Sequence, residues 1–99
     1  YPDYANKLIE SFSNDSVDYG ILICGSGIGM SIAANRSHLV RAALCNDEEM
    51  AKLARQHNDA NVLVLGARII NYEIAIKVIN KFFSTDFIGG RHKERIDKI

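Results

Sequence analysis

The sequence predicts an α/β fold in which helices cover both faces of a parallel sheet. Three short apolar runs, at residues 17–24, 41–45 and 62–65, are typical of buried parallel strands. Stretches with apolar residues at helical spacing separate them. Because a single helix between strands implies a right-handed crossover, the three strands are expected to lie parallel in one sheet. Ninety-nine residues suffice for one domain, which we expect to span residues 1–99.

The first half of the chain contains two predicted helices. Pro2 suits the first turn of a helix, because its missing N–H group needs no partner there. Apolar residues recur at helical spacing from Ala5 to Phe12, and the polar residues 13–16 end this helix. Residues 30–35 follow a glycine-rich stretch and are compatible with a second helix.

The second half contains three predicted helices. Asn46 or Asp47 can cap the helix that follows the second strand. Asn71 can cap a helix over residues 72–83, whose apolar residues form a stripe on one face. Residues 91–99 are predicted to form a basic terminal helix.

Composition argues against several classes of protein. Twelve basic and twelve acidic residues cancel, which does not favour nucleic acid or an anionic membrane as the main partner. No apolar run in these residues approaches the ~18 needed to span a bilayer. Cys24 and Cys45 are expected to be reduced thiols in the cytoplasm. The cysteines and histidines lack the paired spacing of a metal site, so no metal is expected.

The strongest functional signal is the glycine-rich segment CGSGIG at residues 24–29, which follows the first predicted strand. In parallel sheets, ligands bind beyond the carboxyl ends of the strands. Its three glycines let several backbone N–H groups point into one concavity. The G-x-G-x-G spacing differs from the G-x-G-x-x-G dinucleotide fingerprint, so a nicotinamide cofactor is a poor interpretation. The alternative is a tight strand-to-helix turn that binds nothing.

Cys24 favours catalysis at this segment. A thiol that ends a strand and faces a helix N-terminus is stabilised as the thiolate, which can abstract a proton next to a carbonyl group. The N–H groups from Ser26 to Gly29 can bind the oxygen that becomes negative as an enediolate forms. A buried, inert thiol is the usual alternative, and Cys45 is interpreted in that way.

Four other side chains are candidates, each with a structural alternative. His57 lies at a helix end, where it can carry protons for opening a sugar ring or simply interact with the helix dipole. Arg68 follows the third strand and can pair with a phosphate or with a carboxylate such as Glu73. Arg91 and Arg95 share one helical face, where they can grip a phosphate or lie on a solvated basic helix.

Four segments together resemble the ribose-5-phosphate isomerase B family, which also includes the galactose-6-phosphate isomerase subunits. In chain order they read ILICGSGIGMSIAAN, RAALCND, ARQHNDANVLVLGARI and FIGGRHKERIDKI. The resemblance implies a Rossmann-like three-layer sandwich, and a homodimer or homotetramer without metal or organic cofactor. It also implies interconversion of an aldose phosphate and a ketose phosphate through an enediolate.

The resemblance assigns a role to each matching residue. Cys24 is similar to the proton-transferring base, and Met30 stands where some relatives carry a glutamate instead. Ser26 matches a residue that assists at the sugar oxygens, His57 the ring-opening histidine, and Asn58 its substrate-contacting neighbour. The positions that match the enediolate hole and the phosphate-binding arginines are Gly25, Gly27, Ile28, Gly29, Arg68, Arg91 and Arg95.

The resemblance also predicts how the site is completed. Active sites in this family are shared across a dimer interface, so His57, Asn58 and the arginines are expected to face the Cys24 of a partner subunit. Family members begin with a strand that carries an Asp-His pair, followed by a helix and a second strand. These elements have no counterpart in the 99 residues, so we expect the domain to be N-terminally incomplete relative to the family.

Three functions therefore remain open at this point. The first is an isomerase of ribose 5-phosphate and ribulose 5-phosphate, as in the pentose phosphate pathway. The second is an isomerase of six-carbon sugar phosphates, such as galactose or allose 6-phosphate. The third is a non-catalytic subunit of the same fold that binds a sugar phosphate.

Overall fold

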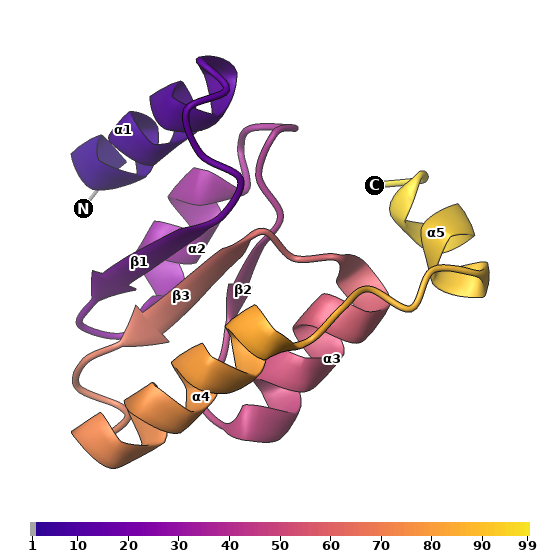
Figure 1. Ribbon diagram of the computed structural model, residues 1–99. Helices are drawn as coiled ribbons and strands as arrows, with labels where there is room; N and C mark the ends of the chain where they lie inside the picture. Colours follow the sequence, from indigo (N-terminus) through magenta and orange to yellow (C-terminus); the bar gives the residue numbers. More distant parts are fainter. Residues whose placement is uncertain (1) are drawn as a thin grey trace.

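A computed structural model of the chain describes residues 2–99 and has the predicted alternation of helices and strands (Figure 1). The elements are, in chain order, α1 (Pro2–Ser13), β1 (Gly20–Cys24), α2 (Ile28–Ala34), β2 (Ala42–Leu44), α3 (Glu48–Asn58), β3 (Val62–Gly66), α4 (Tyr72–Ser84) and α5 (Arg91–Ile96). The predicted α/β class is therefore confirmed. No helix within the described residues is long and apolar enough to cross a membrane.

The three strands form one parallel sheet in the order β1-β3-β2. In its register Gly20 lies opposite Val62, and Cys24 lies opposite Gly66. The first strand begins later than the predicted residue 17, because β3 starts at Val62 and offers no partner to residues before Gly20. Since the strands are parallel, their carboxyl ends meet at one edge of the sheet, and Cys24 lies at that edge.

The core lies on both faces of the sheet, because the side chains of the central strand alternate. Val62 and Val64 of β3 belong to a cluster with residues of α1 and α2. Leu63 and Leu65 point to the other face and pack with residues of α3 and α4. All four are at most 3% exposed. This double burial explains why residues 62–65 form an unbroken apolar run in the sequence.

Side-chain caps fix where two of the helices begin. The Asp47 carboxylate accepts a hydrogen bond from the Met50 N–H at 2.8 Å, so Asp47 and not Asn46 caps α3. The Asn71 side chain accepts one from the Ile74 N–H at 2.9 Å and caps α4. The terminal helix is shorter than the predicted 91–99 and ends at Ile96.

Candidate active site

Cys24 is the last residue of β1 and is half-buried. Its Sγ atom accepts a hydrogen bond from the Gly27 N–H at 3.2 Å, and the Ser26 Oγ accepts one from the Ile28 N–H at 3.2 Å. Gly27 has a φ of 81°, which places it in the left-handed region that glycine adopts without strain. The loop therefore folds back on itself, and a backbone N–H group points at the thiol. The thiol therefore lies within the concavity that the glycine-rich loop forms.

The loop is held against the turn that follows β3. The Ala67 N–H donates to the Cys24 carbonyl oxygen at 2.8 Å, and the Arg68 N–H donates to the Gly25 carbonyl oxygen at 2.9 Å. Gly66 allows this close approach, since a Cβ at that position would collide with the Ser26 carbonyl oxygen and lie 2.7 Å from its carbon. Nothing in the sequence around Gly66 marks this role, because the contact joins two segments far apart in the chain.

A methyl group at Gly66 is expected to damage both stability and the loop. Gly66→Ala forces the Ser26 backbone away from β3, and overpacking of this kind typically costs about 1–3 kcal/mol. Gly20→Ala, at the other end of the sheet, is the matched control. There the added Cβ meets only the end of the Leu8 side chain, which can move. Urea unfolding measures the two free energies, and equal losses in both variants would contradict this account.

Arg68 lies beside the same loop. Its side chain is exposed, and a Cβ at Gly25 would lie 3.4 Å from the Arg68 Nε atom. Within the described residues Arg68 forms no ion pair, so the alternative pairing with Glu73 is not present. Cys24, Ser26 and Arg68 therefore make up one group of predicted site residues at the carboxyl end of the sheet.

The other predicted residues form a second group around the end of α3. His57 and Asn58 are the last two residues of that helix, and the imidazole of His57 stacks on that of His92 from α5. The ring centroids lie 4.2 Å apart, with an angle of 9° between the planes. Arg91 and Arg95 flank His92 on α5 and are exposed, and neither forms an ion pair within residues 2–99.

His92 was not singled out in the sequence, because nothing in the local pattern marks it. The side chain is only 8% exposed and is the buried residue of α5. Burial lowers the pKa of His92, and the positive charges of His57, Arg91 and Arg95 lower it further. Protonation of His92 is therefore disfavoured in the folded protein. Because the unfolded chain binds this proton more readily than the folded protein, the free energy of unfolding falls as pH drops below the ordinary histidine pKa.

Asn58 also borders a cavity of about 380 Å³. The cavity lies between the start of β2, the end of α3 and α5, and its lining includes His38, Arg41 and Ile96. It brings together residues that lie far apart in the sequence, so no sequence pattern predicted it. Among residues 2–99, no three His, Cys, Asp or Glu side chains come together as metal ligands.

The two groups lie at opposite ends of the sheet. Cys24 ends β1, whereas His57 and Asn58 precede β3, so the length of a strand separates them. Five residues of strand span on the order of 13 Å. Figure 1 shows α5 far from the tips of the strand arrows. Within one chain the predicted base therefore does not meet the predicted ring-opening histidine.

Cys45 is a core residue, as the sequence analysis expected. It is 1% exposed, and both cysteines are free thiols. Burial and the nearby Asp47 carboxylate raise the pKa of Cys45 to about 11. In the unfolded chain the pKa of this thiol returns to the ordinary 9.0, so the unfolded state loses the proton first as pH rises.

Folding stability is therefore expected to fall between pH 9 and pH 11. A shift of this size corresponds to roughly 2–3 kcal/mol at most. Because other groups titrate in the same range, the measurement compares the wild type with Cys45→Ala by urea unfolding at several pH values. The free energy of unfolding should fall less with pH in Cys45→Ala than in the wild type. Equal pH dependence in the two proteins would contradict the raised pKa of Cys45.

Comparison with known proteins identifies the family. A family model described as Ribose/Galactose Isomerase matches residues 1–99. A putative sugar phosphate isomerase of Rickettsia conorii is 54% identical over the whole chain, which covers 69% of that protein. Ribose-5-phosphate isomerase B of Escherichia coli is 42% identical, and the chain covers 66% of its length.

Solved structures agree with this assignment. A ribose 5-phosphate isomerase from Thermotoga maritima superposes with a TM-score of 0.96 and 55% identity, over 99% of this chain and 68% of that one. The type B enzyme of Trypanosoma cruzi gives a TM-score of 0.95 and 47% identity, over 99% of this chain and 66% of that one. The chain thus spans about two thirds of these proteins, and it belongs to the ribose/galactose isomerase family of enzymes.

Proposed function

We propose that this chain supplies the active-site residues of an isomerase that interconverts ribose 5-phosphate and ribulose 5-phosphate. The proposal rests on one observation above all. In a chain of the isomerase family, the Cys24 thiol stands at the carboxyl end of β1 and accepts a hydrogen bond from the Gly27 N–H at 3.2 Å. This position, at the edge of a parallel sheet where ligands bind, is where the reaction needs its base.

The proton transfer runs between neighbouring carbons of the open-chain sugar. The Cys24 thiolate takes the proton from C2 of ribose 5-phosphate, and the electrons of that bond form the C1–C2 double bond of an enediolate. The former carbonyl oxygen becomes negative and is bound by N–H groups of residues 25–29 other than those of Gly27 and Ile28, which donate to Cys24 Sγ and Ser26 Oγ. Ser26 assists at the sugar oxygens. The proton of the C2 hydroxyl passes to the C1 oxygen, and the thiol returns the carbon-bound proton to C1, so that C2 becomes the carbonyl carbon of ribulose 5-phosphate and the thiolate is restored. Met30 is 3% exposed and apolar, so it offers no competing base.

The second group of residues prepares and holds the substrate. Ribose 5-phosphate is a ring in solution, and His57 can move the proton that opens it, because imidazole titrates near neutral pH. Asn58 contacts the sugar. Arg91 and Arg95 hold the phosphate from α5, and Arg68 is a further phosphate ligand from the Cys24 end.

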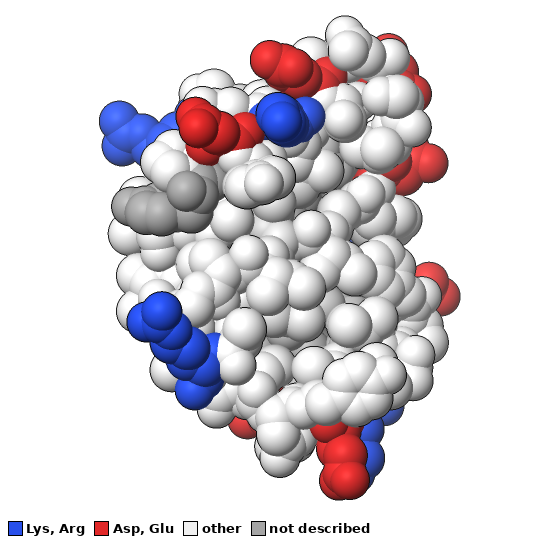
Figure 2. Space-filling view, turned by 90° about the vertical axis from the view of Figure 1, so that its left-hand side faces the viewer, with Lys and Arg blue, Asp and Glu red and all other residues white. Residues whose placement is uncertain are grey.

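The two groups act together when two copies of the chain associate. A homodimer lets the Cys24 loop of one copy face His57 and α5 of the other, and two-fold symmetry then forms two sites. Exposed apolar side chains at the Cys24 end support an interface there. Ile23, Ile28, Ile69 and Tyr72 are 55–78% exposed. Figure 2 shows that side of the molecule as a broad surface with few charged groups at its centre.

The test is conversion of ribose 5-phosphate to ribulose 5-phosphate. It is run on residues 1–99 and on a longer version, to which the additional segment found in the relatives has been added. Galactose 6-phosphate is assayed in parallel, since the family description names galactose as well as ribose. We expect conversion of ribose 5-phosphate. Conversion of galactose 6-phosphate alone would favour the six-carbon substrate. If neither version of the protein converted either sugar phosphate, a binding subunit would be favoured.

A further inference from the structure

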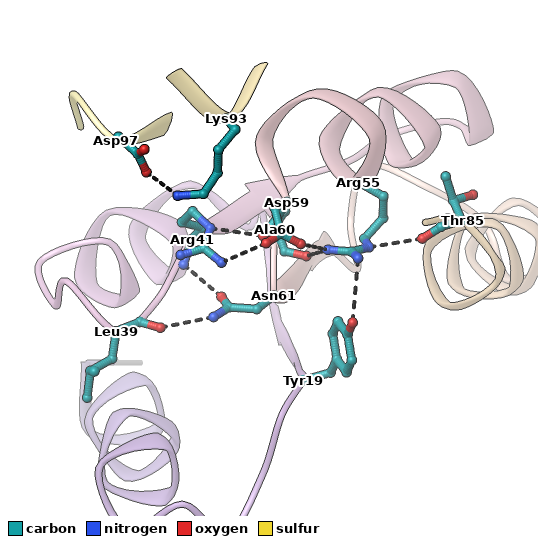
Figure 3. A network of polar contacts seen from close by, with 10 residues as sticks. All are labelled: Tyr19, Leu39, Arg41, Arg55, Asp59, Ala60, Asn61, Thr85, Lys93 and Asp97. Carbon is teal, nitrogen blue, oxygen red and sulfur yellow. Dashed lines mark hydrogen bonds and ion pairs between the residues drawn. The ribbon is translucent and has the colours of Figure 1, made fainter. Parts of the chain in front are cut away.

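Arg55 is a buried cation that the proposed mechanism does not use. It lies in the last turn of α3 and is 5% exposed. A buried charge is costly unless it is paired and hydrogen-bonded. Its Nη1 atom donates to the Asp59 carboxylate at 2.9 Å and to the Ala60 carbonyl oxygen at 2.6 Å. Its Nε atom donates to the Thr85 carbonyl oxygen at 3.1 Å, and its Nη2 atom donates to the Tyr19 hydroxyl at 3.5 Å (Figure 3). Two of these partner segments lie beside the second group of site residues.

The first of these segments is the turn that follows Asn58. Asp59 adopts a φ of 46°, which is strained for a residue with a side chain. Two cations hold its carboxylate in that turn, since Arg41 Nη2 lies 3.4 Å from the other carboxylate oxygen. Arg41 also donates from Nε to the Asp59 carbonyl oxygen at 2.9 Å. The turn fixes how α3 ends, and with it the placement of Asn58.

The second segment leads from α4 to α5. Arg55 donates to the Thr85 carbonyl oxygen, and three residues further along the chain the Ile88 N–H donates to the Gln56 carbonyl oxygen at 3.1 Å. The His92 ring then stacks on His57. Residues 85–92 are therefore held along the last turn of α3 at three successive points, of which Arg55 is the first. This arrangement sets where α5 begins, and α5 carries both predicted phosphate ligands.

We propose that Arg55 is a positioning residue of the isomerase. Its planar fork binds the turn after Asn58 and the segment before α5 at the same time, and so fixes the ring-opening histidine relative to the phosphate-binding arginines. A lysine keeps the charge but has one nitrogen, which cannot reach both segments in the same geometry. The inference rests on the proposed function, because it assigns Arg55 a role through His57 and α5.

The test separates positioning from a purely structural role. Arg55→Lys is compared with Asn35→Ala, which also removes paired side-chain hydrogen bonds between two elements. Asn35 donates to the Ala42 carbonyl oxygen at 3.0 Å and accepts from the Ala42 N–H at 2.8 Å. It lines the cavity that Asn58 borders, but its side chain forms no hydrogen bond to α3 or α5 within residues 2–99. Both variants should unfold at a lower temperature. All kinetics are measured on the form of the protein that isomerises, at a temperature where circular dichroism shows each variant fully folded.

Two readouts respond to positioning but not to stability alone. One is the KM for ribose 5-phosphate, which we expect Arg55→Lys to raise by about tenfold or more, because small misplacements of binding groups are costly. The other is deuterium exchange into ribulose 5-phosphate relative to net conversion, in heavy water. Exchange into ribulose 5-phosphate needs only formation of the enediolate, whereas net conversion of ribose 5-phosphate also needs the sugar ring to be opened. A misplaced His57 slows only the ring opening, so Arg55→Lys should raise the ratio of exchange to net conversion. Asn35→Ala should leave both within twofold of the wild type.

A second variant covers the case in which Arg55→Lys does not fold. Asp59→Asn tolerates the left-handed turn and keeps one acceptor for Arg55, so the same two quantities should rise by a smaller factor. If the wild type isomerises and neither folded variant changes KM or the exchange ratio, the positioning role is wrong. If the wild type converts no sugar phosphate, the proposed function fails and this inference fails with it.

Discussion

Replacing Cys24 by serine is expected to abolish isomerisation and to leave substrate binding within a few-fold. A serine hydroxyl does not ionise near neutral pH, so the base that removes the C2 proton is lost. General base catalysis contributes ~10²–10⁴-fold, which is the expected fall in turnover. Deuterium exchange into ribulose 5-phosphate should fall by the same factor, because it passes through the same enediolate. Conversion is followed by absorbance and exchange by proton NMR.

The matched control is Cys45→Ala. Cys45 is the only other cysteine, and it is 1% exposed in the core. This variant should lose some stability and keep its turnover. Undiminished turnover in Cys24→Ser would rule out Cys24 as the base. A loss in Cys45→Ala as large as that in Cys24→Ser would mean that thiol replacement acts through the fold.

Removing both arginines of α5 is expected to raise the KM for ribose 5-phosphate by about 100-fold or more. Arg91 and Arg95 are exposed and have no ion-pair partner among residues 2–99, so both are available to a phosphate dianion. Hydrogen bonds to charged groups are worth roughly 1.5–3 kcal/mol each, and about 1.4 kcal/mol corresponds to tenfold in affinity. Steady-state kinetics on Arg91→Ala/Arg95→Ala measures the effect.

Lys93→Ala/Lys98→Ala is the control for charge. It removes an equal number of positive charges, two, from the same part of the chain, and Lys93 already pairs with Asp97. A specific phosphate grip predicts little change in KM for this variant. A comparable rise in both double variants would indicate a general electrostatic effect, and an unchanged KM in the arginine variant would contradict the assignment.

Much of the fold could be predicted from the sequence, because local patterns determine it. The apolar run at residues 62–65 identified β3 as a strand, and Asn71 identified the start of α4. The beginning of β1 was less predictable, since it depends on where β3 starts. The length of a strand thus depends on pairing with a distant segment, and the residue pattern at positions 17–19 carries no information about that pairing.

The candidate site was predictable in part for the same reason. The Cys24 loop is contiguous in sequence, so its glycines and thiol could be read together. The contact between Gly66 and Ser26, the stack of His92 on His57 and the reach of Arg55 to Thr85 all join residues far apart in the chain. Such contacts leave no periodic signal. The sharing of a site between subunits came from the family resemblance and stays a prediction.

Mixing two impaired variants, assayed with ribose 5-phosphate well below the KM of the arginine variant, tests the shared site most directly. Cys24→Ser and Arg91→Ala/Arg95→Ala are combined in equal amounts, unfolded and refolded together, and native mass spectrometry confirms the mixed dimers. If each site takes Cys24 from one copy and the arginines from the other, every mixed dimer regains one intact site. Random pairing then restores about a quarter of the wild-type activity. Mixed dimers that form without any recovery would contradict the shared site.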